Sequence, residues 1–94
     1  MELKRVVVTG LGAITPIGNT VEDFWKGLVS GTNGVGPITR FDSSLFKTRF
    51  ACEVKGYDPL NFFEKKDVRK YDLFAQFCMV SADEAIRDSG IAPV

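Results

Sequence analysis

Two cysteines carry the thiol nucleophiles of this sequence, and neither has a partner that would activate it. Cys52 and Cys78 lie 26 positions apart, and the 94 residues contain no histidine. A reactive thiolate needs a nearby base or positive charge that lowers its pKa. Free cysteine is also among the most often buried residue types. We therefore expect both cysteines to pack in a core, and their spacing suggests neither a zinc site nor a disulfide framework.

A compact group of charges occupies residues 64–70, with four positive and two negative side chains. Lys66, Arg69 and Lys70, here called the basic cluster, fall at i, i+3 and i+4 and so share one face of a helix. Cations at the amino end of a helix oppose its dipole and slightly destabilise the helix. Such a cost is offset if the cations bind a partner. The residues alone leave two interpretations equally open, a partner-binding face and a solvated helix start.

Gly10 and Gly12 follow a valine-rich run, as the first glycines of a dinucleotide-binding loop do. The rest of that fingerprint is missing, because Thr15 stands where the third small residue belongs. Pro16 and Gly18 also prevent a helix from starting at once, and no acidic residue closes a second strand about 20 positions later. The pattern therefore favours a tight structural turn over a nucleotide site.

The elements that position these residues begin with Leu3–Thr9, a short apolar run rich in valine that predicts a strand buried on both faces of a sheet. The glycine-rich segment Gly10–Gly18, here called the glycine loop, predicts structured loop. Thr20 and Asp23 resemble a capping box and predict a helix start, and Gly31 predicts its end. The apolar positions of this helix recur at helical spacing; they are Val21, Phe24, Trp25, Leu28 and Val29.

The second half of the chain contains weaker signals and one strong one. Thr32–Thr48 shows no sustained period and predicts loop, and Phe50–Lys55 alternates weakly, as a short edge strand does. Asp58–Phe63 predicts a short helical turn, with proline at its first position. Val68–Ser89 predicts one helix of about twenty residues, roughly 30 Å long, which Gly90 closes.

The middle of that last helix, residues 73–82, is apolar on nearly every side, which is typical of a helix buried inside a large structure. A chain of 94 residues buries only about 65% of its unfolded surface. We therefore expect more polypeptide in the natural context. The abrupt end at Val94 favours a missing downstream sequence over an extensive oligomer interface.

The composition is that of an ordinary soluble globular protein, with 45% hydrophobic and 26% charged residues. Twelve basic and twelve acidic side chains cancel, so no overall field favours nucleic acid or an anionic membrane. No run approaches the roughly 18 apolar residues that span a bilayer, and the amino terminus does not resemble a signal peptide. We expect a cytoplasmic protein without a nucleic-acid or membrane partner.

Three blocks of the sequence together resemble the opening of the elongating β-ketoacyl-acyl-carrier-protein synthases of bacterial type II fatty acid synthesis. The blocks are Lys4–Gly12, Thr15–Glu22 and Arg69–Phe74. The resemblance implies an α/β, thiolase-like fold that assembles as a homodimer. In that fold a βαβαβαββ half sandwiches a mixed sheet between helices, and residues 1–94 would be the first part of the amino-terminal domain.

The resemblance also implies an activity. Such enzymes move an acyl group from acyl carrier protein onto a cysteine, decarboxylate malonyl carrier protein with the help of two histidines, and condense the two groups. They need no cofactor beyond the carrier's phosphopantetheine arm, and no metal. The family's nucleophile and both histidines lie beyond Val94, so no catalytic residue is assigned to this chain, which we expect to be inactive alone.

The basic cluster matches positions at which these synthases dock the acidic helix of acyl carrier protein. The resemblance therefore implies that Lys66, Arg69 and Lys70 bind the carrier. The alternative from another functional class is a stand-alone interaction module that binds an acidic carrier protein through the same helix face.

Overall fold

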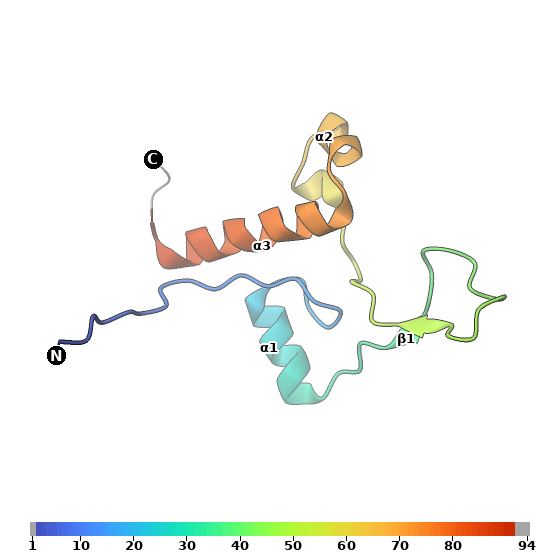
Figure 1. The fold of residues 1–94 in the computed structure, drawn as a ribbon, viewed down its shortest axis with the longest axis horizontal. Helices are drawn as coiled ribbons and strands as arrows, with labels where there is room; N and C mark the ends of the chain where they lie inside the picture. Colours follow the sequence, from blue (N-terminus) through green and yellow to red (C-terminus); the bar gives the residue numbers. More distant parts are fainter. Residues whose placement is uncertain (1, 92–94) are drawn as a thin grey trace.

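Two helices form the body of this chain together with an amino-terminal loop that runs between them in space (Figure 1). A thin hairpin extends from this body. The computed structural model describes residues 2–91. Met1 and residues 92–94, which include the abrupt end at Val94, lie outside the described residues. In chain order the elements are α1 (Val21–Ser30), β1 (Gly36–Pro37), β2 (Phe50–Ala51), the 3-10 helix η1 (Pro59–Asn61), α2 (Lys65–Lys70) and α3 (Leu73–Ser89).

Helix α1 begins and ends where the sequence predicts, because local residues cap it. The Thr20 hydroxyl accepts a hydrogen bond of 3.1 Å from the Asp23 amide. Gly31 closes the helix in the left-handed conformation at φ 70°, and the next amide, that of Thr32, donates to the Gly27 carbonyl at 2.9 Å. Both ends of α1 are therefore confirmed.

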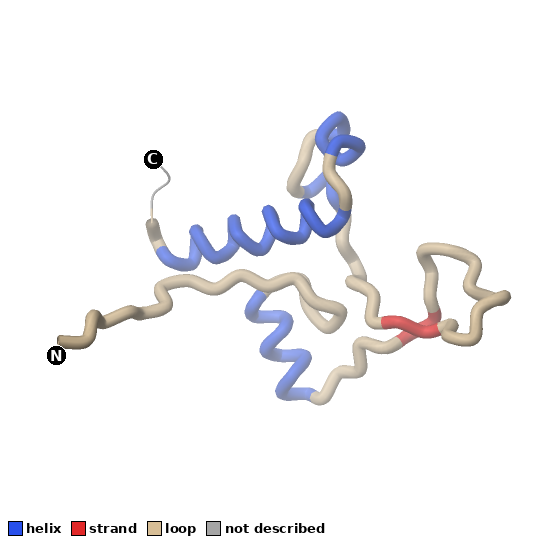
Figure 2. Tube along the Cα trace, viewed as in Figure 1, coloured by secondary structure: helices blue, strands red, loops and turns tan. Residues whose placement is uncertain are grey.

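The predicted core strand at Leu3–Thr9 is wrong for the described residues. This segment projects from the body without strand structure (Figure 2), and its side chains stay exposed, with Val6 at 88% and Val8 at 80%. A strand buried on both faces needs neighbouring strands that pair with its amides and carbonyls. Residues 2–91 place no such strand beside it, so the apolar run stays uncovered.

The predicted helix Val68–Ser89 is two helices separated by a sharp break. Tyr71 and Asp72 are extended, with ψ angles of 131° and 160°. The Asp72 carbonyl accepts the first hydrogen bond of α3, from the Gln76 amide at 3.0 Å. Gly90 ends α3 at φ 73°, as the sequence predicts. The basic cluster therefore belongs to the separate, six-residue helix α2.

The edge strand predicted at Phe50–Lys55 is confirmed in part, as the two-residue strand β2. It pairs antiparallel with β1, which lies inside the predicted loop Thr32–Thr48. Pro37 of β1 has no amide to donate, which limits the ladder. The pairing continues by one hydrogen bond, from the Ile38 amide to the Arg49 carbonyl at 3.0 Å.

The predicted turn at Asp58–Phe63 is confirmed as η1. The Asp58 carboxylate accepts a hydrogen bond of 3.0 Å from the Leu60 amide, and proline occupies the first helical position.

No helix within residues 2–91 combines the length and the apolar character needed to cross a bilayer.

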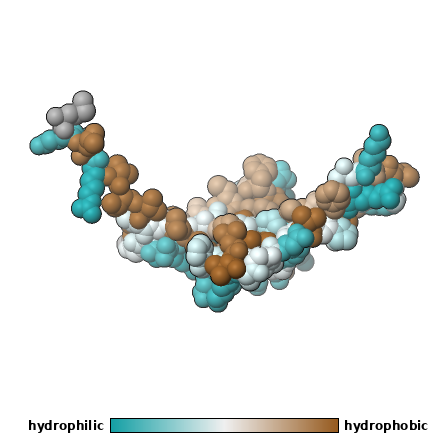
Figure 3. All heavy atoms as spheres, turned by 90° about the horizontal axis from the view of Figure 1, so that it is seen from below, coloured by the Kyte–Doolittle hydropathy of each residue, from teal (hydrophilic) through white to brown (hydrophobic). Residues whose placement is uncertain are grey.

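The apolar side chains do not close into a core among the described residues. No hydrophobic residue there is fully buried, and Phe74, in the predicted buried middle of α3, is 76% exposed. The solvent-accessible area is 7,905 Å², against roughly 5,400 Å² for a compact chain of this mass. The radius of gyration is 17.0 Å, against about 12 Å for a compact domain. Figure 3 shows apolar surface along the projecting amino-terminal segment, which includes Leu3–Thr9, and on the body.

The expected burial of both cysteines is likewise wrong for the described residues. Cys78 lies on an uncovered part of α3, and Cys52 follows β2 in the thin hairpin, so both thiols are free and exposed. Burial of a cysteine needs a second layer of side chains over its element. Residues 2–91 do not supply that layer at either position.

Helix α3 packs directly on the backbone of the glycine loop, which passes beneath it (Figure 1). A Cβ atom added at Gly10 would overlap the Ala85 carbonyl oxygen, and one added at Gly12 would overlap that of Ser81. Both glycines are needed because backbone meets backbone here. Gly10 and Gly12, which resemble part of a nucleotide-binding fingerprint, therefore allow α3 to pack closely against the glycine loop.

We predict that Gly12→Ala destabilises the protein by about 1–3 kcal/mol, because the new methyl group would push α3 away from the glycine loop. Urea unfolding monitored by circular dichroism measures the change. Gly36→Ala is the matched control, since no atom of the described part of the chain lies within 4 Å of a Cβ at Gly36. Equal unfolding midpoints for the two variants would show that α3 does not rest on Gly12.

Candidate functional site

The basic cluster lies exposed on α2, where the helix brings Lys66, Arg69 and Lys70 together. Lys66 Nζ lies 3.6 Å from Glu64 Oε2, and both side chains are more than three-quarters exposed. Lys70 Nζ lies 5.6 Å from the centre of the Tyr71 ring. Exposed pairs of these kinds contribute little, so the three cations stay available to a partner.

The short length of α2 reverses one expectation about its electrostatics. Because α2 ends at Lys70, both Arg69 and Lys70 lie in its last turn. The carboxyl end of a helix carries partial negative charge, so it stabilises these two cations. The penalty predicted for cations at the start of one long helix is therefore wrong for them.

Gln76 holds the junction between α2 and α3. It is the one buried polar side chain among the described residues, at 3% exposure. Its Nε2 donates to the Tyr71 carbonyl at 2.8 Å and approaches the Val68 carbonyl at 3.4 Å, while its Oε1 accepts from the Tyr57 hydroxyl at 2.7 Å. Sequence reasoning missed Gln76, although its lone amide interrupts the apolar run Leu73–Val80.

Aromatic neighbours hold the Tyr57 ring that completes this junction. The ring meets Phe77 edge-on at 5.0 Å and stacks on Phe62 at 5.8 Å between centroids. Burial, with a smaller contribution from the charge of Asp58, raises the pKa of Tyr57 above its ordinary value. The hydroxyl therefore stays protonated at neutral pH and remains a donor to Gln76.

The amino end of α1 is an anion site that the chain fills itself. Glu84 of α3 accepts from the Val21 amide at 3.1 Å through Oε2 and from the Ala13 amide at 2.9 Å through Oε1. Asp88 accepts from the Leu11 amide at 3.0 Å. Amides of this kind bind the phosphates of nucleotides in other proteins. Because carboxylates already occupy them, the structure gives no support to a dinucleotide site.

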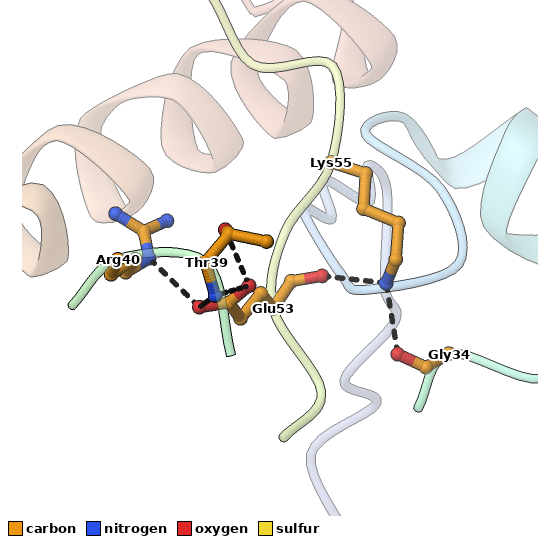
Figure 4. A network of polar contacts seen from close by, with 5 residues as sticks. All are labelled: Gly34, Thr39, Arg40, Glu53 and Lys55. Carbon is orange, nitrogen blue, oxygen red and sulfur yellow. Dashed lines mark hydrogen bonds and ion pairs between the residues drawn. The ribbon is translucent and has the colours of Figure 1, made fainter. Parts of the chain in front are cut away.

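A lysine ammonium joins the hairpin to the glycine loop. Lys55 Nζ donates to the carbonyls of Gly34 at 2.8 Å, Glu53 at 2.8 Å and Pro16 at 3.2 Å; Figure 4 shows the first two. Three acceptors use all three ammonium donors. Lys55 is therefore a structural cross-link and has no donor left for a substrate.

Glu53, beside Lys55 in Figure 4, anchors the other leg of the hairpin. Its carboxylate accepts from the Thr39 hydroxyl at 2.8 Å and from the Thr39 amide at 3.2 Å, and Arg40 Nε lies 3.9 Å away. The hydrogen bond from the Thr39 side chain is the main cause that lowers the pKa of Glu53.

The described residues hold no assembled centre for covalent or metal chemistry. No three of their Cys, Asp or Glu side chains gather as metal ligands would, and the sequence contains no histidine to act as a base. What these residues can offer a partner is an exposed cationic surface on α2.

Comparison with known proteins identifies the family. The family model described as "Beta-ketoacyl synthase, N-terminal domain" matches residues 3–94. The chain belongs to the β-ketoacyl synthase family. It is 53% identical over 89 residues to 3-oxoacyl-[acyl-carrier-protein] synthase 2 of Synechocystis sp. and 52% identical over 91 residues to the protein of the same name from Coxiella burnetii.

These matches cover nearly all of the chain but a small part of each relative. They span 95% and 97% of this chain and 21% and 22% of the two synthases, so the chain corresponds to about a fifth of their length. Among solved structures, the ishigamide ketosynthase/chain length factor matches with a TM-score of 0.81 and 35% identity, over 92% of this chain and 21% of that one. The predicted α/β, thiolase-like fold class is confirmed by this likeness to a ketosynthase.

We predict that acid weakens the Glu53 anchor. A carboxyl whose pKa is lowered on folding stabilises the protein above its unfolded pKa, near 4.5, and this stabilisation is lost as the pH falls through the lower folded value. Thr39→Val should therefore flatten the fall of the urea midpoint between about pH 5 and pH 3. Thr39→Ser keeps the hydroxyl and is the control; a slope equal to wild type in both variants would contradict the assignment.

Proposed function

We propose that this chain is the amino-terminal part of a β-ketoacyl-acyl-carrier-protein synthase of fatty acid biosynthesis. The reaction is the decarboxylative condensation of malonyl-acyl carrier protein with an acyl-acyl carrier protein, in which an acyltransferase forms a new carbon–carbon bond. Family membership supports this proposal, as do relatives named 3-oxoacyl-[acyl-carrier-protein] synthase 2 at up to 53% identity.

In this proposal the residues described here supply scaffold and docking surface, and the nucleophilic cysteine and the two histidines come from elsewhere in a longer chain. The exposed apolar side chains of α1 and α3 support the need for more polypeptide, since Trp25 is 65% and Phe74 76% exposed. Covering such residues gives about 25 cal/mol per Å² of apolar area. Residues 1–94 are then the first part of the amino-terminal domain.

The docking partner in this proposal is acyl carrier protein, held by Lys66, Arg69 and Lys70. The observation that carries it is that all three cations lie exposed on one short helix of a chain whose net charge is zero. Exposed ion pairs are worth at most about 1 kcal/mol each and mainly steer and orient the encounter. The proposed complex is therefore sensitive to salt.

The proposed enzyme is a cytoplasmic homodimer without a nucleic-acid or membrane partner. Its substrates arrive on the carrier's phosphopantetheine arm, and it uses no other cofactor and no metal. The second candidate is a stand-alone interaction module that binds an acidic carrier through α2. The uncovered apolar surface of residues 2–91 favours the synthase, because a free-standing module buries such surface itself.

We predict that Arg69→Ala in the intact synthase raises the KM for malonyl-acyl carrier protein by up to about fivefold, because it removes one steering charge. The effect should grow as salt is lowered. The matched control is Lys26→Ala, which removes a cation that is 70% exposed on α1, away from the basic cluster. Unchanged KM values in an Arg69→Ala variant that also carries Lys66→Ala and Lys70→Ala would exclude docking on α2.

A further inference from the structure

We propose that Gln76 and Tyr57 form a latch that fixes the orientation of α2 and thereby positions the basic cluster for docking. Neither latch residue belongs to the cluster, so both would act on the carrier only through α2. The inference rests on the proposed docking function and adds positioning residues to it.

The need for a latch follows from the size of α2. Six residues are too few for a helix that is stable in water by itself, so its orientation depends on what holds its ends. At its carboxyl end the chain turns through the extended residues Tyr71 and Asp72. The Gln76 amide reaches back from the first turn of α3 to the carbonyls of Val68 and Tyr71, one inside α2 and one just after it.

The hydrogen bonds of the latch leave its amide one arrangement. The Val68 and Tyr71 carbonyls can only accept hydrogen bonds, so Nε2 must face them, and Oε1 is left to accept from the Tyr57 hydroxyl at 2.7 Å. The two Nε2 protons then match the two carbonyl acceptors, at 2.8 Å to Tyr71 and 3.4 Å to Val68. A flipped amide would set a carbonyl oxygen against two others. The two carbonyls therefore set the orientation of the amide, and Tyr57 pairs the oxygen atom on its other side.

Burial makes the latch costly to break. Gln76 is 3% exposed, and an amide buried to this degree is stable only when its polar atoms are paired. The aromatic contacts of Tyr57 with Phe62 and Phe77 keep the hydroxyl in place. Removing either latch residue leaves buried polar groups without partners, and α2 then gains freedom to reorient.

Loss of the latch should affect docking more than chemistry. All three cations sit on α2, so a tilt of this one helix misplaces them together. Docking that works by orientation depends on keeping such groups in register. A substrate thioester without a carrier protein does not use the basic cluster and should not sense the tilt.

The test compares two substrates in the intact synthase, malonyl-acyl carrier protein and malonyl-pantetheine. The variants are Gln76→Leu and Tyr57→Phe, each alone. We expect the KM for malonyl-acyl carrier protein to rise about threefold to tenfold in both, with kcat within about twofold of wild type. The kinetic constants for malonyl-pantetheine should not change. Ser81→Ala is the matched control, because within residues 2–91 the Ser81 hydroxyl bonds only to carbonyls of its own helix, those of Phe77 and Cys78.

Arg69→Ala, measured in parallel, separates failure of the latch from failure of docking. A raised carrier KM in Arg69→Ala with normal values in both latch variants overturns the latch and leaves docking intact. Unchanged values in both latch variants and in the variant that carries Lys66→Ala, Arg69→Ala and Lys70→Ala together overturn both. An equal loss with both substrates shows that Gln76 is merely structural and also overturns the latch. If Gln76→Leu does not fold, Tyr57→Phe decides alone, since it removes only a hydroxyl.

Discussion

The direct contact between α3 and the glycine loop is the constraint on which the rest of the structure depends. Gly10 and Gly12 let helix backbone approach loop backbone. The carboxylates of Glu84 and Asp88 then accept loop amides that the close approach would otherwise leave unpaired. Because Glu84 also accepts the Val21 amide, the same contact attaches the start of α1 to α3.

Helix α3 is therefore the frame for both ends of the described chain. Toward its carboxyl end Glu84 holds the start of α1, and in its first turn Gln76 holds the end of α2. A buried amide thus ties the helix of the exposed basic cluster to α3. The apolar residues left open on α1 and α3, such as Trp25 and Phe74, are the surface on which the rest of a ketosynthase would pack in our proposal.

Features set by neighbouring residues were predictable from the sequence, and features set by distant partners were not. Thr20 and Gly31 cap α1 locally, so both of its ends were found. At the break, Gln76 bonds to the Tyr71 carbonyl and to Tyr57, which lies 19 positions before that glutamine, and local sequence does not reveal this distant partner. The strand predicted at Leu3–Thr9 needs neighbours that residues 2–91 do not provide. The docking role of the basic cluster came from family resemblance, since spacing alone left its function open.

The most direct test of the central claim joins two measurements on one sample of the native protein, its intact mass and its malonyl-dependent condensation activity. The account predicts a polypeptide several times the mass of these 94 residues that releases carbon dioxide and forms a β-ketoacyl product on acyl carrier protein. A polypeptide of 94 residues that unfolds cooperatively and has no condensing activity would contradict it and leave an interaction module in its place.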